Sequence, residues 1–321
     1  MYNFIILGSH TDYCKVMCHD VLDKDHVYFE NHGDYLTNGA LRLIRQVHHS
    51  YKINKVAKLP LKKVWYPYNL DESKISQSAK NVFIVFDSNQ QVYNEAYLHY
   101  LKNKFNGHLV LMLVNTISSI KSHDPNFFNK VYDRIFTTDL KDSRDYNYQY
   151  LPGLYSKTQV NEDPSSKNDL FFIGANKGRL EFLHEIAKKM EYNDVHYSIN
   201  IIGVEEKDQL DFEDLHYNNR MNYQQVLHET QSTNCILEVV QEGQSSLTLR
   251  AIEAIVYNKK LITNNEWTKE SAFYNPKYIQ IYNNVDEIDV DFIKEKVDVD
   301  YEYDHLYSPL RLLERIEKLL G

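Results

Sequence analysis

The chain has 321 residues, of which 43% are hydrophobic and 25% charged, and its formal net charge at pH 7 is −9. This composition excludes a disordered chain and supplies apolar residues for two domains of ordinary size. The acidic balance argues against general nucleic-acid binding, and no apolar run has the length of a membrane span. The three cysteines (Cys14, Cys18 and Cys235) do not suggest a disulfide framework, so we expect a reducing, cytoplasmic location.

The first half alternates strand-type and helix-type segments. Apolar runs predict strands at 3–7, 81–86, 108–114 and 134–137, and helical periodicity predicts helices at 36–51, 91–104 and 127–132. Apolar strands alternating with helices are typical of a parallel sheet covered on both faces. The polar loops after such strands line the working crevice. Here those loops hold His10, Asp12, Asp87 and Asn115.

One segment of the first half stands out by its charge. From Tyr35 to Leu70 there is no Asp or Glu, and apolar residues alternate with basic ones. The cations of this basic segment are Arg42, Arg45, Lys52, Lys55, Lys58, Lys62 and Lys63. A positive patch on an acidic protein suits an anionic partner, such as an anionic membrane or a phosphate-bearing acceptor. The alternative is a solvated face balanced by acids from elsewhere in the fold.

The apolar rhythm stops between Lys141 and Lys167, which predicts a linker. The second half then repeats the strand–helix pattern. Strands are predicted at 169–173, 196–203, 235–240, 260–263 and 279–282, and helices at 180–190, 223–230, 247–257 and 308–320. We therefore predict one α/β domain at 1–150, a second at 151–305, and a terminal helix at 306–321.

Two loops of the second half have features of phosphate-binding loops. The first, Gly174 to Arg179, contains a second glycine and the cation Lys177 before a helix. The second loop follows the strand at 235–240. This loop and the helix after it contain Ser245, Ser246, Thr248, Arg250 and Glu253. A strand that enters a helix through small residues offers backbone N–H groups and the helix dipole to an anion. Simple helix capping and a solvated loop are the alternatives.

The segment EGQSSLTLRAIEA resembles the E-G…E-A region of glycosyltransferases of the GT-B type. The segments FFIGANKGR and YLPGLYS, and the terminal helix, extend the resemblance, most nearly to bacterial enzymes that build capsular, exopolysaccharide or lipopolysaccharide chains. It implies two Rossmann-like domains facing each other across a cleft. The N-terminal domain would bind the acceptor, and the C-terminal domain would bind a nucleotide-sugar donor.

The resemblance also implies roles for individual residues. Glu253 matches the glutamate that bonds the ribose hydroxyls, and Ser245 stands where the family has its other glutamate, with Glu242 as the candidate replacement. The other implied donor-binding residues are Gly174, Lys177, Arg179, Asn222, Tyr223, Gly243, Gln244, Ser246, Thr248 and Arg250. An inverting enzyme needs a base for the acceptor hydroxyl. His10 or Asp12 is the candidate.

The function implied is transfer of a sugar, which we expect to be linked to UDP, to a glycan or lipid-linked acceptor. We expect no cofactor and no metal, because the Asp-Val-Asp strings at 289–291 and 298–300 lie outside the strand–helix series. The basic segment would then face the inner side of the cell membrane. Two alternatives remain: a nucleotide-sugar epimerase of the same fold, and a non-catalytic subunit that binds nucleotide or sugar.

Overall fold

The structure is a computed structural model that describes residues 2–8, 12–31, 35–89, 93–120, 125–159, 168–240 and 245–321, without the side chains of Asp12, Tyr13, Tyr51 and Asn89. The chain forms two compact units. Unit 1 comprises Met1–Ser156 and Tyr307–Gly321, and unit 2 comprises Lys157–Leu306. Each unit is described by itself. No helix among the described residues is long and apolar enough to cross a membrane.

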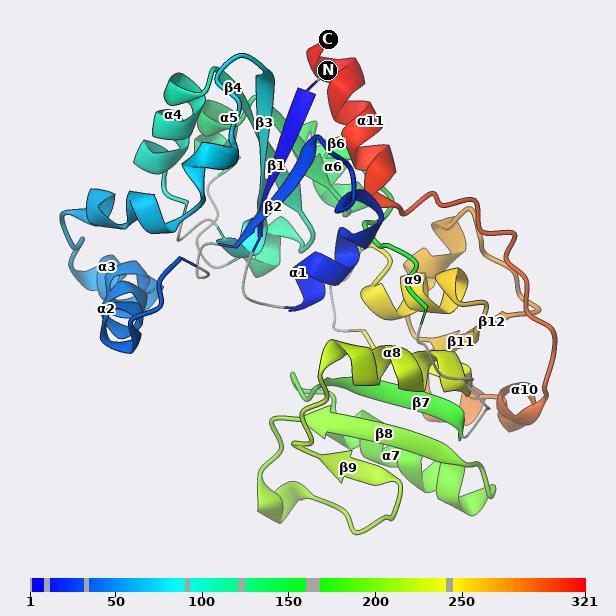
Figure 1. The fold of residues 1–321 in the computed structure, drawn as a ribbon. Coiled ribbons are helices and arrows are strands. Elements are labelled where there is room, and N and C mark those ends of the chain that lie inside the picture. Colours follow the sequence, from blue (N-terminus) through cyan, green and yellow to red (C-terminus); the bar gives the residue numbers. More distant parts are fainter. Residues whose placement is uncertain are drawn as a thin grey trace. The chain divides into compact units, whose positions relative to one another are not determined.

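Unit 1 is built on a parallel sheet with the strand order β2-β1-β3-β4-β5-β6 (Figure 1). Its strands are β1 (Tyr2–Gly8), β2 (Val27–Asn31), β3 (Lys80–Phe86), β4 (Gly107–Leu113), β5 (Arg134–Thr137) and β6 (Gln149–Tyr150). Its helices are α1 (Asp12–Met17), α2 (Gly39–His49), α3 (Tyr51–Val56), α4 (Glu95–Lys104), α5 (Pro125–Val131), α6 (Leu140–Tyr146) and α11 (Pro309–Leu320). The strand order reverses between β1 and β3, which is where ligands bind in open α/β sheets.

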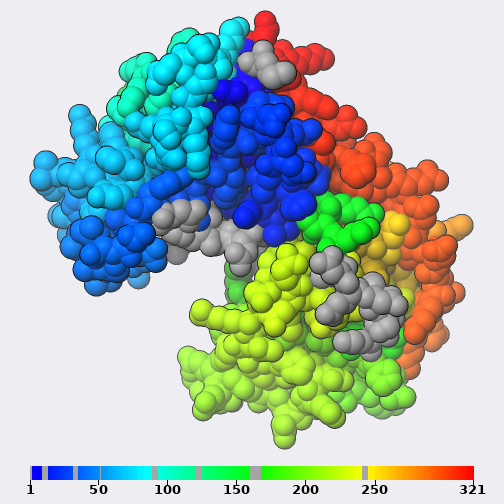
Figure 2. Space-filling view, viewed as in Figure 1, coloured from blue at the N-terminus to red at the C-terminus, as the bar shows by residue number. Residues whose placement is uncertain are grey.

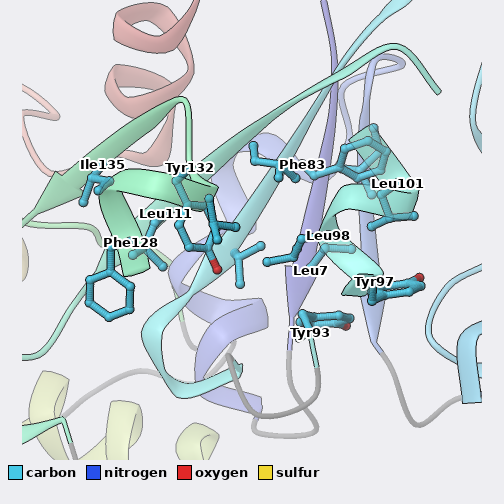
Figure 3. Packing of buried hydrophobic residues seen from close by; sticks show 14 of the residues in the cluster. Leu7, Phe83, Tyr93, Tyr97, Leu98, Leu101, Leu111, Phe128, Tyr132 and Ile135 are labelled. Carbon is cyan, nitrogen blue, oxygen red and sulfur yellow. The ribbon is translucent and has the colours of Figure 1, made fainter. Parts of the chain in front are cut away.

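The two faces of this sheet are covered by different helices. Ile5 and Leu7 of β1 belong to a core cluster with α4 and α5, whereas Phe4 and Ile6 belong to a cluster with α11. This division follows from the alternation of side chains along a strand. Figure 3 shows the first cluster, with Phe83 and Leu111 from the sheet, Leu98 and Leu101 from α4, and Phe128 from α5.

The terminal helix α11 is part of unit 1. Ser308 caps its first turn, and Leu312, Leu313 and Ile316 are buried in the unit 1 core. At its other end, the Tyr2 hydroxyl donates to the carbonyl oxygen of Leu320 at 2.9 Å. The chain therefore returns to unit 1 after completing unit 2.

Several local predictions for unit 1 differ from the structure. The helix expected at 36–51 corresponds to α2, which ends at His49. The short helix α3 was not predicted, and Ser50, in an extended conformation, separates it from α2. The segment expected to be a linker begins with the helix α6 and the strand β6, and β6 is part of the unit 1 sheet. Its residues 160–167 lie outside the described residues. β2 was not predicted. Its sequence, VYFEN, mixes apolar and polar residues because it is an edge strand.

Unit 2 contains a second parallel sheet, with the order β12-β11-β10-β7-β8-β9. Its strands are β7 (Asn168–Ala175), β8 (Tyr197–Ile202), β9 (Leu215–Tyr217), β10 (Thr233–Glu238), β11 (Lys260–Thr263) and β12 (Ile279–Ile281). Its helices are α7 (Leu180–Tyr192), α8 (Tyr223–Ser232), α9 (Leu249–Val256) and α10 (Val290–Lys294). Here the order reverses between β7 and β10. The strand β9, at the edge of this sheet, was not predicted.

Candidate functional site

The candidate site is the carboxyl edge of the unit 2 sheet at the switch point between β7 and β10. β10 pairs in parallel with β7, for example Ile236 with Phe171, so both strands end at the same edge. The loop after β7 is the predicted glycine loop, and the loop after β10 is the predicted serine loop. The structure therefore brings the two loops to adjacent strand ends. Residues 241–244, with Glu242, Gly243 and Gln244, lie outside the described residues.

Arg179 joins the ends of these two strands. Its guanidinium donates to the carbonyl oxygen of Ala175 at 2.6 Å and to that of Val239, and it lies over the ring of Phe172. Burial lowers the pKa of Arg179 from its ordinary value. Three backbone and ring contacts hold this cation at the floor of the site. Arg179 therefore ties the ends of the two loops together.

Gly174 makes room for that arrangement. A Cβ atom at Gly174 would lie 3.0 Å from Nη2 of Arg179 and 3.0 Å from Cζ of Phe172. Further along the loop, Lys177 and Gly178 have φ angles of 45° and 81°. Both residues are exposed, and Lys177 is the cation of this loop that a ligand can reach. The glycine loop therefore offers a positive charge on a tight backbone turn.

A buried carboxylate that sequence analysis missed lies beneath the second loop. Glu238 ends β10 with 2% of its surface exposed, and it accepts hydrogen bonds from the hydroxyls of Thr248 and Thr263. The backbone N–H of Ala251 also bonds this carboxylate. Burial raises the pKa of Glu238, while the hydroxyl and amide donors oppose that shift. The signal available in the sequence was one acidic residue inside the apolar run CILEVV.

Glu238 fixes the entry to α9. Thr248 is the N-cap residue of α9, with its hydroxyl accepting from the N–H of Arg250 at 3.1 Å. The side chain of Asn265 donates to the carbonyl oxygen of Ser246 at 3.0 Å, which ties the serine loop to the residues after β11. Some of the backbone N–H groups at the N-terminus of α9 therefore already bond side chains of the protein, as simple helix capping predicts. An anion would have to use the remaining loop groups.

Glu253 lies on α9 with no exposed surface. Its Oε1 accepts from the hydroxyl of Tyr223 at 2.8 Å, and its Oε2 forms an ion pair with Arg250, three residues earlier. The structure therefore brings together three of the predicted donor-binding residues. Because this carboxylate is fully buried, a sugar hydroxyl could reach it only if the side chains that cover it moved.

The other predicted residues of unit 2 lie around this group. Asn222 is exposed and caps α8, where its side chain accepts from the N–H of Gln225 at 3.0 Å and the two residues form a capping box. Ser245 and Ser246 are buried, with 7% and 9% of their surfaces exposed. Among the residues that the structure describes, no three His, Cys, Asp or Glu side chains are grouped so that they could hold a metal ion.

The candidate bases in unit 1 are not visible. His10 lies outside the described residues, and only the backbone of Asp12 is described, as the first residue of α1. At the neighbouring strand end, Asp87 is buried and accepts from the N–H of Asn115 at 2.9 Å and from its side chain at 3.0 Å. Asp87 and Asn115 therefore tie the ends of β3 and β4 together. Burial raises the pKa of Asp87.

The basic segment includes one cation that does not face solvent. Arg45 has 6% of its surface exposed and donates to Oδ1 of Asn69 at 2.7 Å, so it is corrected to a structural residue. It points inward because position 45 lies on the opposite side of α2 from the exposed Leu43 and Val47. The remaining cations are exposed, except Lys62, which is half-buried. They are Arg42, Lys52, Lys55, Lys58, Lys62 and Lys63.

Comparison with known proteins identifies similar folds among solved structures, but no related sequence family. No family model matches the sequence. No curated protein matches it either. Among solved structures, a protein assigned as UDP-N-acetylglucosamine 2-epimerase from Listeria monocytogenes is similar with a TM-score of 0.57 and 10% identity, over 99% of this chain and 96% of that one.

Two similar structures are of glycosyltransferases. An alpha-glucosyltransferase in complex with UDP-glucose and DNA containing an abasic site has a TM-score of 0.56 and 12% identity, over 100% of this chain and 99% of that chain. The glycotransferase of kitacinnamycin has a TM-score of 0.52 and 8% identity, with the same coverage. These similarities confirm the predicted fold class: α/β, with two Rossmann-like domains of the GT-B type.

Proposed function

We propose that the protein is a glycosyltransferase that transfers a sugar from a nucleotide donor, in our expectation a UDP-sugar, without a metal ion. The observation that carries this proposal is the pairing of two loops at the β7–β10 switch point of unit 2. One loop contributes Lys177 beside Gly178, and the other leads into α9 with Arg250 and Glu253. A nucleoside diphosphate fits a site of this kind, because cations and backbone amides converge on one sheet edge.

The contacts support the donor-site roles that we propose. Lys177 is exposed on the glycine loop, and Arg250 retains 18% of its side-chain surface exposed beside Glu253. We assign the ribose hydroxyls to Glu253, whose carboxylate would exchange one present donor for a ligand hydroxyl. Tyr223, at the start of α8, would border the base. The loop at 243–246 is assigned to the diphosphate and the sugar, with Gly243, Gln244, Ser245 and Ser246.

The chemistry of the reaction needs this arrangement. Cleavage of a glycosyl phosphate bond develops positive charge on the sugar and negative charge on the departing diphosphate. Fixed cations and amides at the diphosphate stabilise that separation more than the ground state, which lowers the barrier. Arg179 would act through position: by holding Ala175 and Val239 it keeps the two loops at a constant separation.

The acceptor half of the proposal belongs to unit 1. His10 or Asp12 would accept the proton of the attacking hydroxyl, and the acceptor would be a glycan or a lipid-linked glycan. Glu242, the third catalytic candidate, belongs to unit 2 and would replace the family's other glutamate. The exposed cations of the basic segment support a place at an anionic membrane, where each cation contributes about 1 kcal/mol. Synthesis of a capsular, exopolysaccharide or lipopolysaccharide chain at the inner face of the membrane is the pathway that fits such an acceptor.

One second candidate has an observation in its favour. The similarity to the protein assigned as a UDP-N-acetylglucosamine 2-epimerase shows that this fold also occurs outside the transferases. An epimerase would convert a UDP-sugar without an acceptor and would not release free UDP as its main product. A non-catalytic subunit would bind the nucleotide with no turnover.

The experiment is a product analysis with EDTA present throughout. The protein is incubated with UDP-glucose, UDP-galactose and UDP-N-acetylglucosamine, with and without extracted membrane lipids from a polysaccharide-producing bacterium. Release of UDP that depends on the lipids supports the transferase, and an epimerised UDP-sugar without added lipid supports the epimerase. The variant Lys177→Ala should lose most of the UDP release. The matched variant Lys207→Ala, at an exposed lysine of the same unit, should retain it.

A further inference from the structure

Two pockets on unit 1 adjoin at Tyr66. The first has a volume of about 500 Å³ and is lined by Tyr35, Tyr66, Pro67, Leu70, Asp71, Glu72, Ser73 and Tyr100. The second has a volume of about 470 Å³ and is lined by Leu59, Leu61, Lys62, Lys63, Val64, Tyr66, Asn94 and Ala96. We call them the tyrosine pocket and the aliphatic pocket. Each volume lies within the range of ligand sites.

The aliphatic pocket is lined mainly by the basic segment, which holds most of the exposed large hydrophobic side chains of the described residues. Eight of the large hydrophobic side chains that are exposed belong to the basic segment: Leu41, Leu43, Ile44, Val47, Ile53, Val56, Leu61 and Val64. Elsewhere in the described residues only Tyr146, Tyr192 and Val297 are of this kind. Exposed apolar surface gathered in one place marks a contact with a partner or a membrane. Figures 1 and 2 show the α2 and α3 part of this segment standing out from the rest of unit 1.

Cations rim the aliphatic pocket. Lys62 and Lys63 line it, and burial together with the charge of Lys58 lowers the pKa of Lys62. Two like charges held close to apolar surface favour an anion between them. No Asp or Glu lies between Tyr35 and Leu70 in the sequence to supply it locally. Because the exposed apolar groups here are aliphatic, hydrocarbon suits them better than nucleic-acid bases, which stack on aromatic rings.

The tyrosine pocket has a different chemistry. The rings of Tyr66 and Tyr100 lie with their centroids 5.4 Å apart, and the Tyr100 hydroxyl donates to Oε1 of Glu72 at 2.7 Å. Asp71 and Ser73 add a carboxylate and a hydroxyl. Aromatic faces beside hydrogen-bond acceptors suit a ligand with one apolar face and many hydroxyl groups. A sugar ring is such a ligand.

We propose that the two pockets form one site for an anionic glycolipid. The hydrocarbon chain would enter the aliphatic pocket, the phosphate would lie at Lys58, Lys62 and Lys63, and the attached sugar would reach the tyrosine pocket past Tyr66. This inference rests on the proposed function, because it names the chemical class of the acceptor. It also explains why apolar and basic side chains are combined in a protein whose net charge is −9.

Trp65 provides a local reporter for the test. It lies between Val64 and Tyr66 in the chain, is 5% exposed, and donates from Nε1 to Nδ1 of His48 at 2.8 Å. The chain has two tryptophans, so the variant Trp267→Phe leaves Trp65 alone. Vesicles of phosphatidylcholine, with and without phosphatidylglycerol brominated on its acyl chains, are added to this variant. We expect quenching of Trp65 only with the anionic lipid.

The cations are then tested by charge reversal. Lys58→Glu, Lys62→Glu and Lys63→Glu together should weaken vesicle binding at least about a hundredfold, because the attraction of three cations is lost and the new carboxylates are repelled. The control reverses three exposed lysines of unit 2 (Lys207, Lys277 and Lys296) and changes the net charge equally. Leu61→Asp with Val64→Asp should also abolish the quenching, whereas Tyr192→Asp, at a residue 90% exposed, should not.

The sugar half is tested with soluble ligands. Decyl phosphate and decyl glucosyl phosphate are titrated against Trp65 fluorescence, and the glucosyl compound should bind more tightly. Glu72→Gln should remove that difference and leave the affinity for decyl phosphate unchanged. Equal affinity of the two ligands for the Trp267→Phe protein would overturn the assignment of the tyrosine pocket.

The outcomes separate this inference from the proposed function. Quenching by uncharged vesicles, no quenching at all, or displacement of the lipid by duplex DNA would overturn the lipid site. Stabilisation of the protein by UDP, whose site we assign to unit 2, does not depend on that result. Lipid binding without any UDP stabilisation would instead overturn the transferase and leave an anionic-lipid-binding protein.

Discussion

The hydroxyl of Tyr223 donates a hydrogen bond of 2.8 Å to Oε1 of Glu253, a carboxylate with no exposed surface. This contact joins the start of α8 to the middle of α9, and Arg250 pairs with the other carboxylate oxygen. The proposed ribose-binding residue is therefore already held in place by two side chains before any ligand arrives. Because Glu253 has no exposed surface, a ligand would reach its carboxylate only after the side chains that cover it had moved.

Substitutions that remove the contact between Tyr223 and Glu253 should therefore lower the free energy of unfolding. Tyr223→Phe should lower the free energy of unfolding by about 1 kcal/mol, the usual net value of one hydrogen bond. Glu253→Ala should cost more, because it removes the carboxylate that both Tyr223 and Arg250 contact. Urea denaturation measures both values. Equal effects of the two substitutions would show that Glu253 contributes nothing beyond the Tyr223 contact.

Gly174→Ala should disturb the floor of the site. The new methyl group would press on Arg179 and on the ring of Phe172, so we expect a loss of about 1–3 kcal/mol in the free energy of unfolding. Gly39→Ala is the matched control, because a Cβ at Gly39 meets nothing within 4 Å and lies at the first position of α2. That substitution should leave the protein as stable or slightly more so. A neutral Gly174→Ala would mean that Arg179 is not tightly held.

Glu238 should make stability fall with rising pH. Its pKa in the folded protein is raised above the ordinary value of 4.5 by burial, so the folded state holds its proton more tightly than the unfolded state. The contribution is present below pH 4.5 and is lost as pH rises through the folded-state pKa. The difference in Tm between the wild type and Glu238→Gln should therefore shift in favour of the variant over this range. A Tm difference between the two proteins that does not change with pH would contradict the raised pKa of Glu238.

Arg45 should behave as a structural residue and the cations around it should not. Arg45→Ala removes the partner of the buried Asn69 and should lower the free energy of unfolding by about 2 kcal/mol. Lys52→Ala changes an exposed side chain in the same segment and should leave Tm unchanged. Thermal denaturation compares them. A larger fall in Tm for Lys52→Ala than for Arg45→Ala would contradict the structural role of Arg45.

Much of the fold follows from the sequence because its strands are buried on both faces. Runs such as NVFIVF and HLVLMLV match β3 and β4 within a residue, since parallel strands between two helical layers must be apolar throughout. β2 and β9 lack this signal because edge strands need fewer apolar residues. The short helix α3, which follows Ser50, was not predicted either. A change in backbone direction there has no marker such as glycine or proline.

The candidate site was predicted in its loops and not in its interior. The glycine loop and the serine loop were found because small residues between a strand and a helix follow from local geometry. Glu238 was missed because its partners Thr248 and Thr263 are brought to it by the sheet, from 10 and 25 residues away. For the same reason the sequence could not show that Arg179 would be held by the carbonyl group of Val239.

The most direct test of the donor site is a thermal-shift titration with UDP, GDP, CMP, dTDP and ADP in the presence of EDTA. We predict that one nucleoside diphosphate, UDP, raises Tm, that EDTA does not alter the shift, and that Lys177→Ala and Glu253→Ala each abolish most of it. No stabilisation by any of these nucleotides, or a shift that survives both substitutions, would contradict the donor site at the β7–β10 edge.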